Sequence, residues 1–174
     1  IFVYATTEPQ EALLLGGKTA TLHEGRVTQF DQTIDVYNRP SDLLTAQTFS
    51  DPPMNILPVR KTGSEFVFDA NRIDVPDAVL SLQDGDYTIG IRPHHMSLHQ
   101  PRGKSMKLDC TVSTTEITGS ESFIHLKSKG IHMVALMHGV HRVGIGDEIP
   151  AYLEQDQLFV FDRDKNLVSA PGSD

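Results

Sequence analysis

The pattern of apolar and polar positions changes about fifty residues into the chain and divides it into two parts. In the first part, strand-like and helix-like runs alternate. The run IFVYA at 1–5 is continuously apolar and rich in β-type residues, which predicts a strand buried on both faces. EALLL at 11–15 predicts a helix, and Gly16 and Gly17 are a common way to end one.

The next residues predict a hairpin and a helix. TATLHEGRVTQF at 19–30 reads as two extended segments around a turn at Glu24 and Gly25. DQTIDVYN at 31–38 reads as a helix, which ends before the following Arg-Pro because the residue before a proline disfavours the helical conformation.

A break follows one more predicted helix. SDLLTAQTF at 41–49 is helical in pattern, with Ser41 as its expected cap. SDPPMN at 50–55 then places two prolines in a row, which fit neither the interior of a helix nor a central strand. We therefore place a boundary between the two parts here.

From Asn55 onward the chain consists of short β runs separated by turn residues. The runs are ILPVRK, EFVFD, YTIGI, KLDCTVSTTEI, SFIHLK, IHMVALM and IPAYLE. Met106, Leu108, Cys110 and Val112 alternate with polar residues, so one face of that strand is predicted to be buried, with Cys110 as a core thiol. Short strands at this spacing predict a small barrel or sandwich.

Composition narrows the functional classes. The 174 residues carry 15 basic and 23 acidic side chains, a net charge of −8, which argues against a nucleic-acid-binding surface. A single cysteine excludes an internal disulfide and a cysteine-based zinc site. Because the chain begins at Ile1, we interpret it as a piece of a longer protein, and without a membrane-length apolar run we expect it to be cytoplasmic.

GGKT at 16–19 has the ending of a phosphate-binding loop. That loop needs another glycine five residues before Gly17, where this chain has Ala12, and it must precede a helix rather than follow one. We interpret GGKT as a helix end and predict no complete nucleotide site in these residues.

The eight histidines are candidate metal ligands. His94, His95 and His99 form one group, and His138 and His141 form a second. His94 and His95 are adjacent on a predicted strand and would point to opposite faces, so no native metal site is predicted. The second group is expected to lie solvated in a loop. No Ser-His-Asp or Cys-His set is evident, so the second part by itself is interpreted as a binding or interaction module.

Thr7 is the one candidate site residue of the first part. It precedes a predicted helix with Pro9 in the first turn and Gln10 three residues later, which predicts an N-cap. It also follows a predicted buried strand, and this is where α/β enzymes place reactive side chains.

The order of these motifs resembles one family. EALLL, TATLHEGRVTQFDQTIDVYNRP and DPPMN resemble the C-terminal end of the nucleotide-binding domain of carbohydrate-importer ABC ATPases. IGIRPHH, TGSESFIHL and FDRDKNL resemble motifs of the regulatory domain that follows it, an OB-like module of the TOBE type. The resemblance covers nearly the whole chain.

The resemblance implies a fold class and a function. It implies an α/β segment over 1–50, the end of an ABC nucleotide-binding domain, then an all-β OB-like barrel over 51–174 for regulation and dimerisation. The parent would be a transport ATPase, using ATP and Mg²⁺ bound by upstream residues, that drives uptake of a sugar or a polyol such as glycerol. Its partners would be transmembrane permease subunits and a second ATP-binding subunit, identical or not, on the inner face of the cell membrane.

The chain departs from the family pattern at several positions. Thr7 stands where the family has its switch histidine, and Glu8 replaces the following aspartate. Asp31, Thr33 and His94 stand where glycine, proline and glutamate are usual. A threonine forms hydrogen bonds but cannot become cationic, so the resemblance implies a degenerate site at Thr7 and weakened hydrolysis there.

A second hypothesis comes from a different functional class. The β part would then be a sensor for a small molecule or an oxyanion. No oxyanion motif is visible, and an acidic domain attracts anions poorly.

Overall fold

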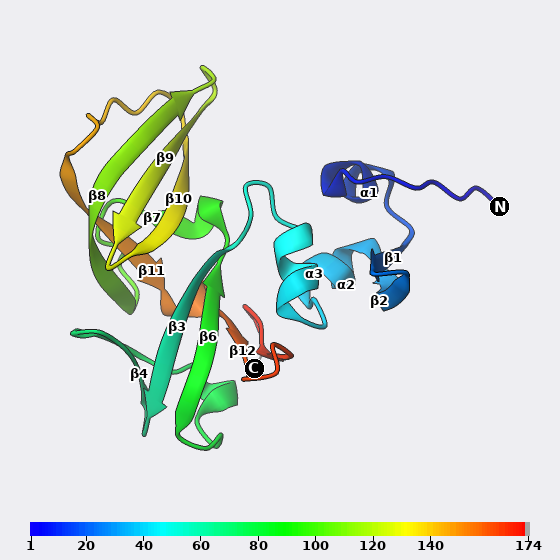
Figure 1. The fold of residues 1–174 in the computed structure, drawn as a ribbon, viewed down its shortest axis with the longest axis horizontal. Coiled ribbons are helices and arrows are strands. Elements are labelled where there is room, and N and C mark those ends of the chain that lie inside the picture. The colour runs from blue at the N-terminus through cyan, green and yellow to red at the C-terminus, as the bar shows by residue number, and fades with distance from the viewer. Residues whose placement is uncertain (173–174) are drawn as a thin grey trace.

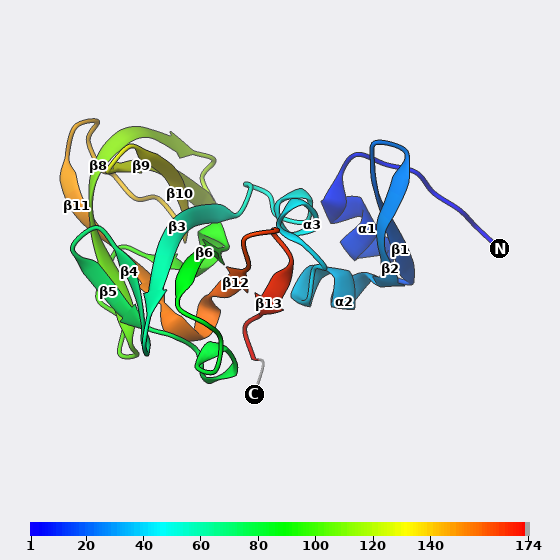
Figure 2. The same ribbon diagram turned by 60° about the horizontal axis from the view of Figure 1, so that its bottom comes forward.

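The computed structural model describes residues 1–172. Helices and one hairpin occupy residues 1–50, and they project from one side of a larger β module (Figures 1 and 2). The elements of this first part are α1 (Pro9–Leu15), β1 (Lys18–His23), β2 (Arg26–Gln32), α2 (Thr33–Asn38) and α3 (Leu43–Thr48).

The β module consists of two antiparallel sheets. Its strands are β3 (Asn55–Thr62), β4 (Glu65–Phe68), β5 (Asn71–Asp74), β6 (Gly85–Ile91), β7 (Met96–Ser97), β8 (Ser105–Ile117), β9 (Glu121–Ser128), β10 (Ile131–His138), β11 (Glu148–Glu154), β12 (Phe159–Phe161) and β13 (Leu167–Ser169). Three 3₁₀ turns connect them, η1 (Asp77–Val79), η2 (Pro93–His95) and η3 (Gln155–Gln157). The strand orders are β10-β9-β8-β11-β7 and β13-β12-β6-β3-β4-β5.

Both sheets bury their apolar faces in one common core. The predicted alternation in β8 is confirmed, because Met106, Leu108, Cys110 and Val112 are each at most 1% exposed. Burial raises the pKa of the Cys110 thiol to about 11, so this cysteine packs as a neutral core side chain. The result is an OB-like, nearly closed barrel, and it confirms the predicted fold class.

A single side chain joins the two sheets at the open edge of β10. Asn55, the first residue of β3, donates through Nδ2 to the carbonyl oxygen of Val134 at 2.8 Å. Its Oδ1 accepts from the Val134 N–H at 2.7 Å. β10 pairs with β9 on its other side, so the Asn55 amide replaces one residue of a missing neighbour strand.

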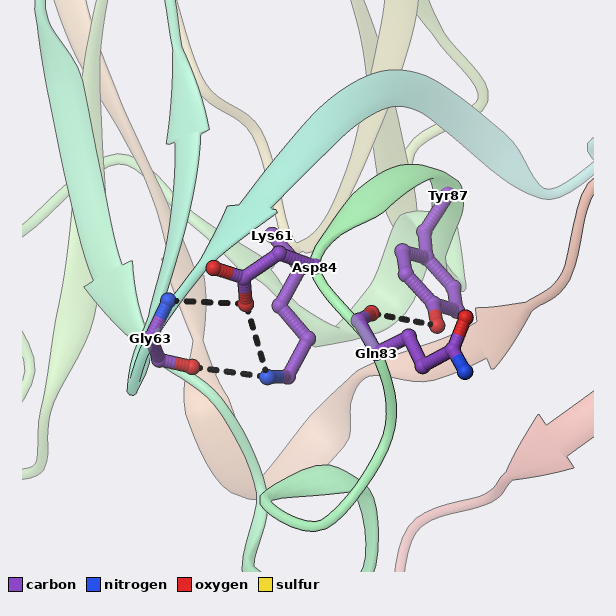
Figure 3. Close-up of polar contacts among 5 residues, drawn as sticks. All are labelled: Lys61, Gly63, Gln83, Asp84 and Tyr87. Carbon is purple, nitrogen blue, oxygen red and sulfur yellow. Dashed lines mark hydrogen bonds and ion pairs between the residues drawn. The ribbon is translucent and has the colours of Figure 1, made fainter.

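A second buried polar group orders the opposite end of β3 (Figure 3). The Lys61 side chain is 2% exposed, and its Nζ donates to the Gly63 carbonyl at 2.7 Å and to the Asp84 carboxylate at 3.3 Å. Asp84 also accepts from the Gly63 N–H at 2.9 Å, while the Tyr87 hydroxyl donates to the Gln83 carbonyl at 2.9 Å. These bonds attach the β3–β4 turn to the loop that leads into β6.

The two parts of the chain share a small apolar cluster. Leu43 and Ala46 of α3 pack with Phe159, Phe161 and Ala170 of the β module. The contact places α3 beside β12. The division into 1–50 and 51–174 stays a prediction.

Two local predictions are confirmed. α1 ends at Gly16, whose φ of 67° is unstrained only for glycine, and the Gly16 N–H donates to the Ala12 carbonyl. The hairpin turn has Glu24 and Gly25 at φ values of 49° and 76°, as a two-residue β-turn of this hand requires.

Two other local predictions are wrong. Residues 1–5 form no strand, and Phe2 and Val3 are exposed, because no described strand pairs with them and a strand buried on both faces needs such neighbours. The cap of α3 is Asp42 rather than Ser41. The helix begins one residue later than expected, so the carboxylate of Asp42 accepts from the Thr45 N–H at 2.7 Å.

Among residues 1–172, no helix combines the length and the hydropathy that a membrane crossing requires.

We predict that Asn55→Ala lowers the free energy of unfolding by about 2–3 kcal/mol, because it leaves the N–H and the carbonyl of Val134 without partners. Chemical denaturation monitored by circular dichroism measures the change. The control is Asn38→Ala at the exposed end of α2, which should change stability by less than about 0.5 kcal/mol. Equal stability of the two variants would show that the barrel closes without Asn55.

Candidate functional site at the junction of the helices and the β module

Thr7 lies in an exposed, irregular segment just before α1. The structure does not support its predicted role as a helix cap. The N-cap position is Glu8, without a side-chain cap, and the Glu8 N–H donates instead to Thr6 Oγ1 at 2.9 Å. Gln10 does not reach back to the helix start, since its Nε2 donates to Asp51 at 2.9 Å. In the described residues, no hydrogen bond involves the Thr7 side chain.

Gln10 belongs to a small cavity between α1 and the β module. The cavity measures about 160 Å³ and receives side chains from α1, from the ends of α2 and α3, and from the segment that follows β6. Its walls include Gln10, Tyr37, Asp51, Arg92 and His94. The sequence motif Arg92-Pro93 therefore lies directly against the helical part.

Arg92 is the centre of this junction and was missed as a site residue by sequence reasoning. It is 2% exposed, yet its guanidinium donates to the carbonyls of Tyr37 and Phe49, both at 2.6 Å. Tyr37 lies in the last turn of α2, and Phe49 is the C-cap residue of α3. The cation thus satisfies carbonyls that helix ends leave unpaired.

Aromatic rings enclose the same guanidinium. Its carbon lies 3.7 Å from the centroid of the Tyr37 ring and 5.3 Å from that of Phe159. Burial lowers the pKa of Arg92, and the neighbouring Tyr37 acts in the opposite direction. An arginine keeps its charge in proteins, so this site holds a permanent cation.

The structure corrects the placement of His94 and His95. Both lie in the 3₁₀ turn η2 rather than on a strand, because Pro93 starts a helical turn directly after β6. Their rings meet edge to face with centroids 4.2 Å apart, so the two side chains lie together instead of on opposite faces. Burial, followed by neighbouring positive groups, lowers the pKa of His94 and brings that of His95 to about 4.

His138 lies near this pair, whereas His99 and His141 make bonds of their own. His138 ends β10, and the His141 ring N–H donates to the His138 carbonyl at 2.9 Å. The carbonyl of His99 accepts from the Ser97 hydroxyl at 2.6 Å. Within residues 1–172, no three histidine, cysteine or carboxylate side chains form a group that could hold a metal ion.

Comparison with known proteins assigns the β module to a family. Residues 89–161, from β6 to β12, match the TOBE domain. Over these residues the chain is similar to the TOBE domain. The matched range includes Arg92 and His94 of the junction.

Proteins similar to most of the chain are ATP-binding proteins of import or uptake systems. A xylose/arabinose import ATP-binding protein of Haloferax volcanii is 28% identical over 166 residues, which are 92% of this chain and 43% of that protein. An ATP-binding protein for uptake of osmoprotective compounds from Synechocystis is 26% identical over 94% of this chain and 47% of its own length. An sn-glycerol-3-phosphate import ATP-binding protein of Rhizobium etli is 30% identical over 72% of this chain and 33% of its length.

The chain therefore spans less than half the length of these relatives. Among solved structures, the cytoplasmic molybdate-binding protein ModG matches 61% of this chain and 94% of its own, with 11% identity and a TM-score of 0.48.

We predict that Arg92→Met lowers the free energy of unfolding by about 2–3 kcal/mol, because the Tyr37 and Phe49 carbonyls lose charge-assisted hydrogen bonds. Arg92→Lys should recover only part of the loss, since an ammonium cannot donate as a planar fork and stack on Tyr37 as well. Denaturation curves measure both effects, with exposed Arg102→Met as the control. If Arg92→Met were as stable as Arg102→Met, the junction would not depend on this cation.

Proposed function

We propose that this chain is the C-terminal part of the ATP-binding subunit of an ABC importer for a sugar or polyol. In this proposal residues 1–50 end the nucleotide-binding domain, and residues 51–174 form its OB-like regulatory and dimerisation domain. The proposal rests on the TOBE match at 89–161 together with relatives that are import ATP-binding proteins aligned over most of the chain.

Exposed apolar side chains in the first part support this division. They gather on the N-terminal segment, α1, the β1–β2 hairpin and α2, and comprise Phe2, Val3, Leu14, Leu15, Leu22, Val27, Phe30 and Ile34. Apolar surface of this extent is typical of an interface rather than of a free surface. A larger nucleotide-binding domain would cover it.

The residues present do not build an ATP site by themselves. GGKT follows α1, so it lies at the carbonyl end of that helix, whose partial negative charge disfavours phosphate. In the proposed parent, upstream residues hold ATP and Mg²⁺, and Thr7 takes the position from which the family's switch histidine acts. Thr7 is exposed and free of side-chain hydrogen bonds in the described residues, which suits a residue that would face a site completed elsewhere.

The proposal also covers the partner subunits of the parent and its cellular location. The parent would act with transmembrane permease subunits and a second ATP-binding subunit, on the cytoplasmic face of the cell membrane. The oxyanion-sensor alternative has less support, because these relatives are import ATP-binding proteins.

The proposed function predicts a difference between this chain and its parent. The parent, reconstituted with its permease and its second ATP-binding subunit, should hydrolyse ATP in a manner stimulated by one sugar or polyol. The 174-residue chain alone should show no saturable, Mg²⁺-dependent ATP binding by isothermal titration calorimetry. Saturable ATP binding to the 174-residue chain would contradict the proposal. So would a parent whose rate of ATP hydrolysis does not change with any sugar or polyol tested.

The degenerate position predicts a gain of activity. In the parent with an intact upstream general base, Thr7→His should raise turnover at its own site on the order of a hundredfold and leave ATP affinity nearly unchanged. Thr7→Ala is the matched control. It should change turnover little and stability by less than about 0.5 kcal/mol, because the Thr7 side chain is exposed. Loss of turnover in Thr7→Ala with stability retained would mean that the threonine itself is catalytic.

A further inference from the structure

The barrel has a seam where its five-stranded sheet nearly closes on itself. β10 and β7 are the two end strands of that sheet, and they lie side by side without pairing (Figure 1). η2 precedes β7 and packs on β10. Side chains rather than backbone hydrogen bonds therefore fill the space between these strands.

A cavity of about 310 Å³ lies along this seam. Three imidazoles, a carboxylate, an amide and a hydroxyl line it beside methionine and leucine side chains; the polar lining residues are His94, His95, Ser97, His138, Glu154 and Gln157. This volume is at the lower end of the range for small-molecule sites. The cavity adjoins the junction, because His94 also lines the smaller cavity near α1.

The lining contains unused hydrogen-bonding capacity. Nδ1 of His95 is buried and has no partner in the described structure, although buried polar atoms are nearly always paired. Across residues 1–172, no hydrogen bond or ion pair uses the side chains of Glu154 or Gln157. The Glu154 carboxylate offers acceptors, and the Gln157 amide offers donors and an acceptor, to a molecule in the cavity.

Charges of opposite sign lie around the cavity. Burial first, and then neighbouring positive groups that include Arg92, lower the pKa values of His94 and His95, so both imidazoles are uncharged near neutral pH. The Arg92 cation repels a cation and attracts an anion, while the Glu154 carboxylate in the lining does the reverse, so the two charges together favour no ion. A neutral ligand with both donors and acceptors remains.

We propose that the seam cavity binds a small neutral polyhydroxyl molecule, a polyol or a monosaccharide. A hydroxyl group donates and accepts, which matches a neutral imidazole and the Gln157 amide, while Glu154 accepts only. The methionine and leucine side chains contact the C–H faces of such a ligand. The proposal stands on the cavity alone and does not depend on the transport function proposed above.

The test is titration of the 174-residue chain with glycerol, xylitol and xylose, followed by isothermal calorimetry or ligand-observed NMR. Phosphate and Zn²⁺ are titrated in parallel. We expect saturable one-to-one binding of at least one of the three hydroxylated probes, with a dissociation constant of about 1 mM or lower. The three probes separate polyol from sugar. Saturation by phosphate or Zn²⁺ alone would overturn the proposal, as would saturation by none of the probes.

Variants locate the binding to the seam. His95→Phe keeps a ring but removes both nitrogens, and Gln157→Leu removes the amide at similar size, so each should weaken binding at least about tenfold. His132→Phe, at an exposed position of β10 outside the cavity, is the control. It should bind the ligand with the same affinity as the unsubstituted 174-residue chain. Circular dichroism checks folding, and if His95→Phe does not fold, Gln157→Leu decides. Unchanged affinity in the folded seam variants would overturn the proposal.

Discussion

The two-point hydrogen bond between Asn55 and Val134 is the constraint on which the arrangement of this protein depends. It joins the first residue of β3 to the open edge of β10, and so it connects the two sheets around their common core. Asn55 lies opposite Ile91 in the β3–β6 register. The bond to β10 therefore lies beside the end of β6, directly before Arg92 and η2.

Arg92, which directly follows β6, binds the ends of helices α2 and α3. Burying a guanidinium is costly, and here two helix-end carbonyls and two aromatic rings offset the cost without a carboxylate. Burial, together with this cation, disfavours protonation of His94 and His95. The buried charge thus binds the ends of α2 and α3 on one side and helps to keep the two imidazoles uncharged on the other, and His94 lines both cavities.

The local elements of the fold were predictable, and most of the candidate site was not. The end of α1 at Gly16 and the alternation of Met106 to Val112 are properties of neighbouring residues, so periodicity and turn chemistry were enough to predict them. The prediction that Thr7 caps α1 was wrong because the cap depends on where the first helical turn starts. The helix begins at Pro9, one residue later than a Thr7 cap requires. The order of motifs led to the importer family, and the TOBE match and the relatives confirmed it.

The sequence by itself determined the end of α1, the β1–β2 turn and the buried face of β8, since these follow from short-range sterics and from the two-residue repeat of a strand. Only the tertiary structure decided what Arg92 and His95 do. Each is surrounded by groups distant in the chain, such as Tyr37, Phe49 and Glu154, and no spacing rule brings these together. Burial and neighbouring charge set the protonation of the imidazoles and the partners of the guanidinium, and both arise only when the two sheets close around one core.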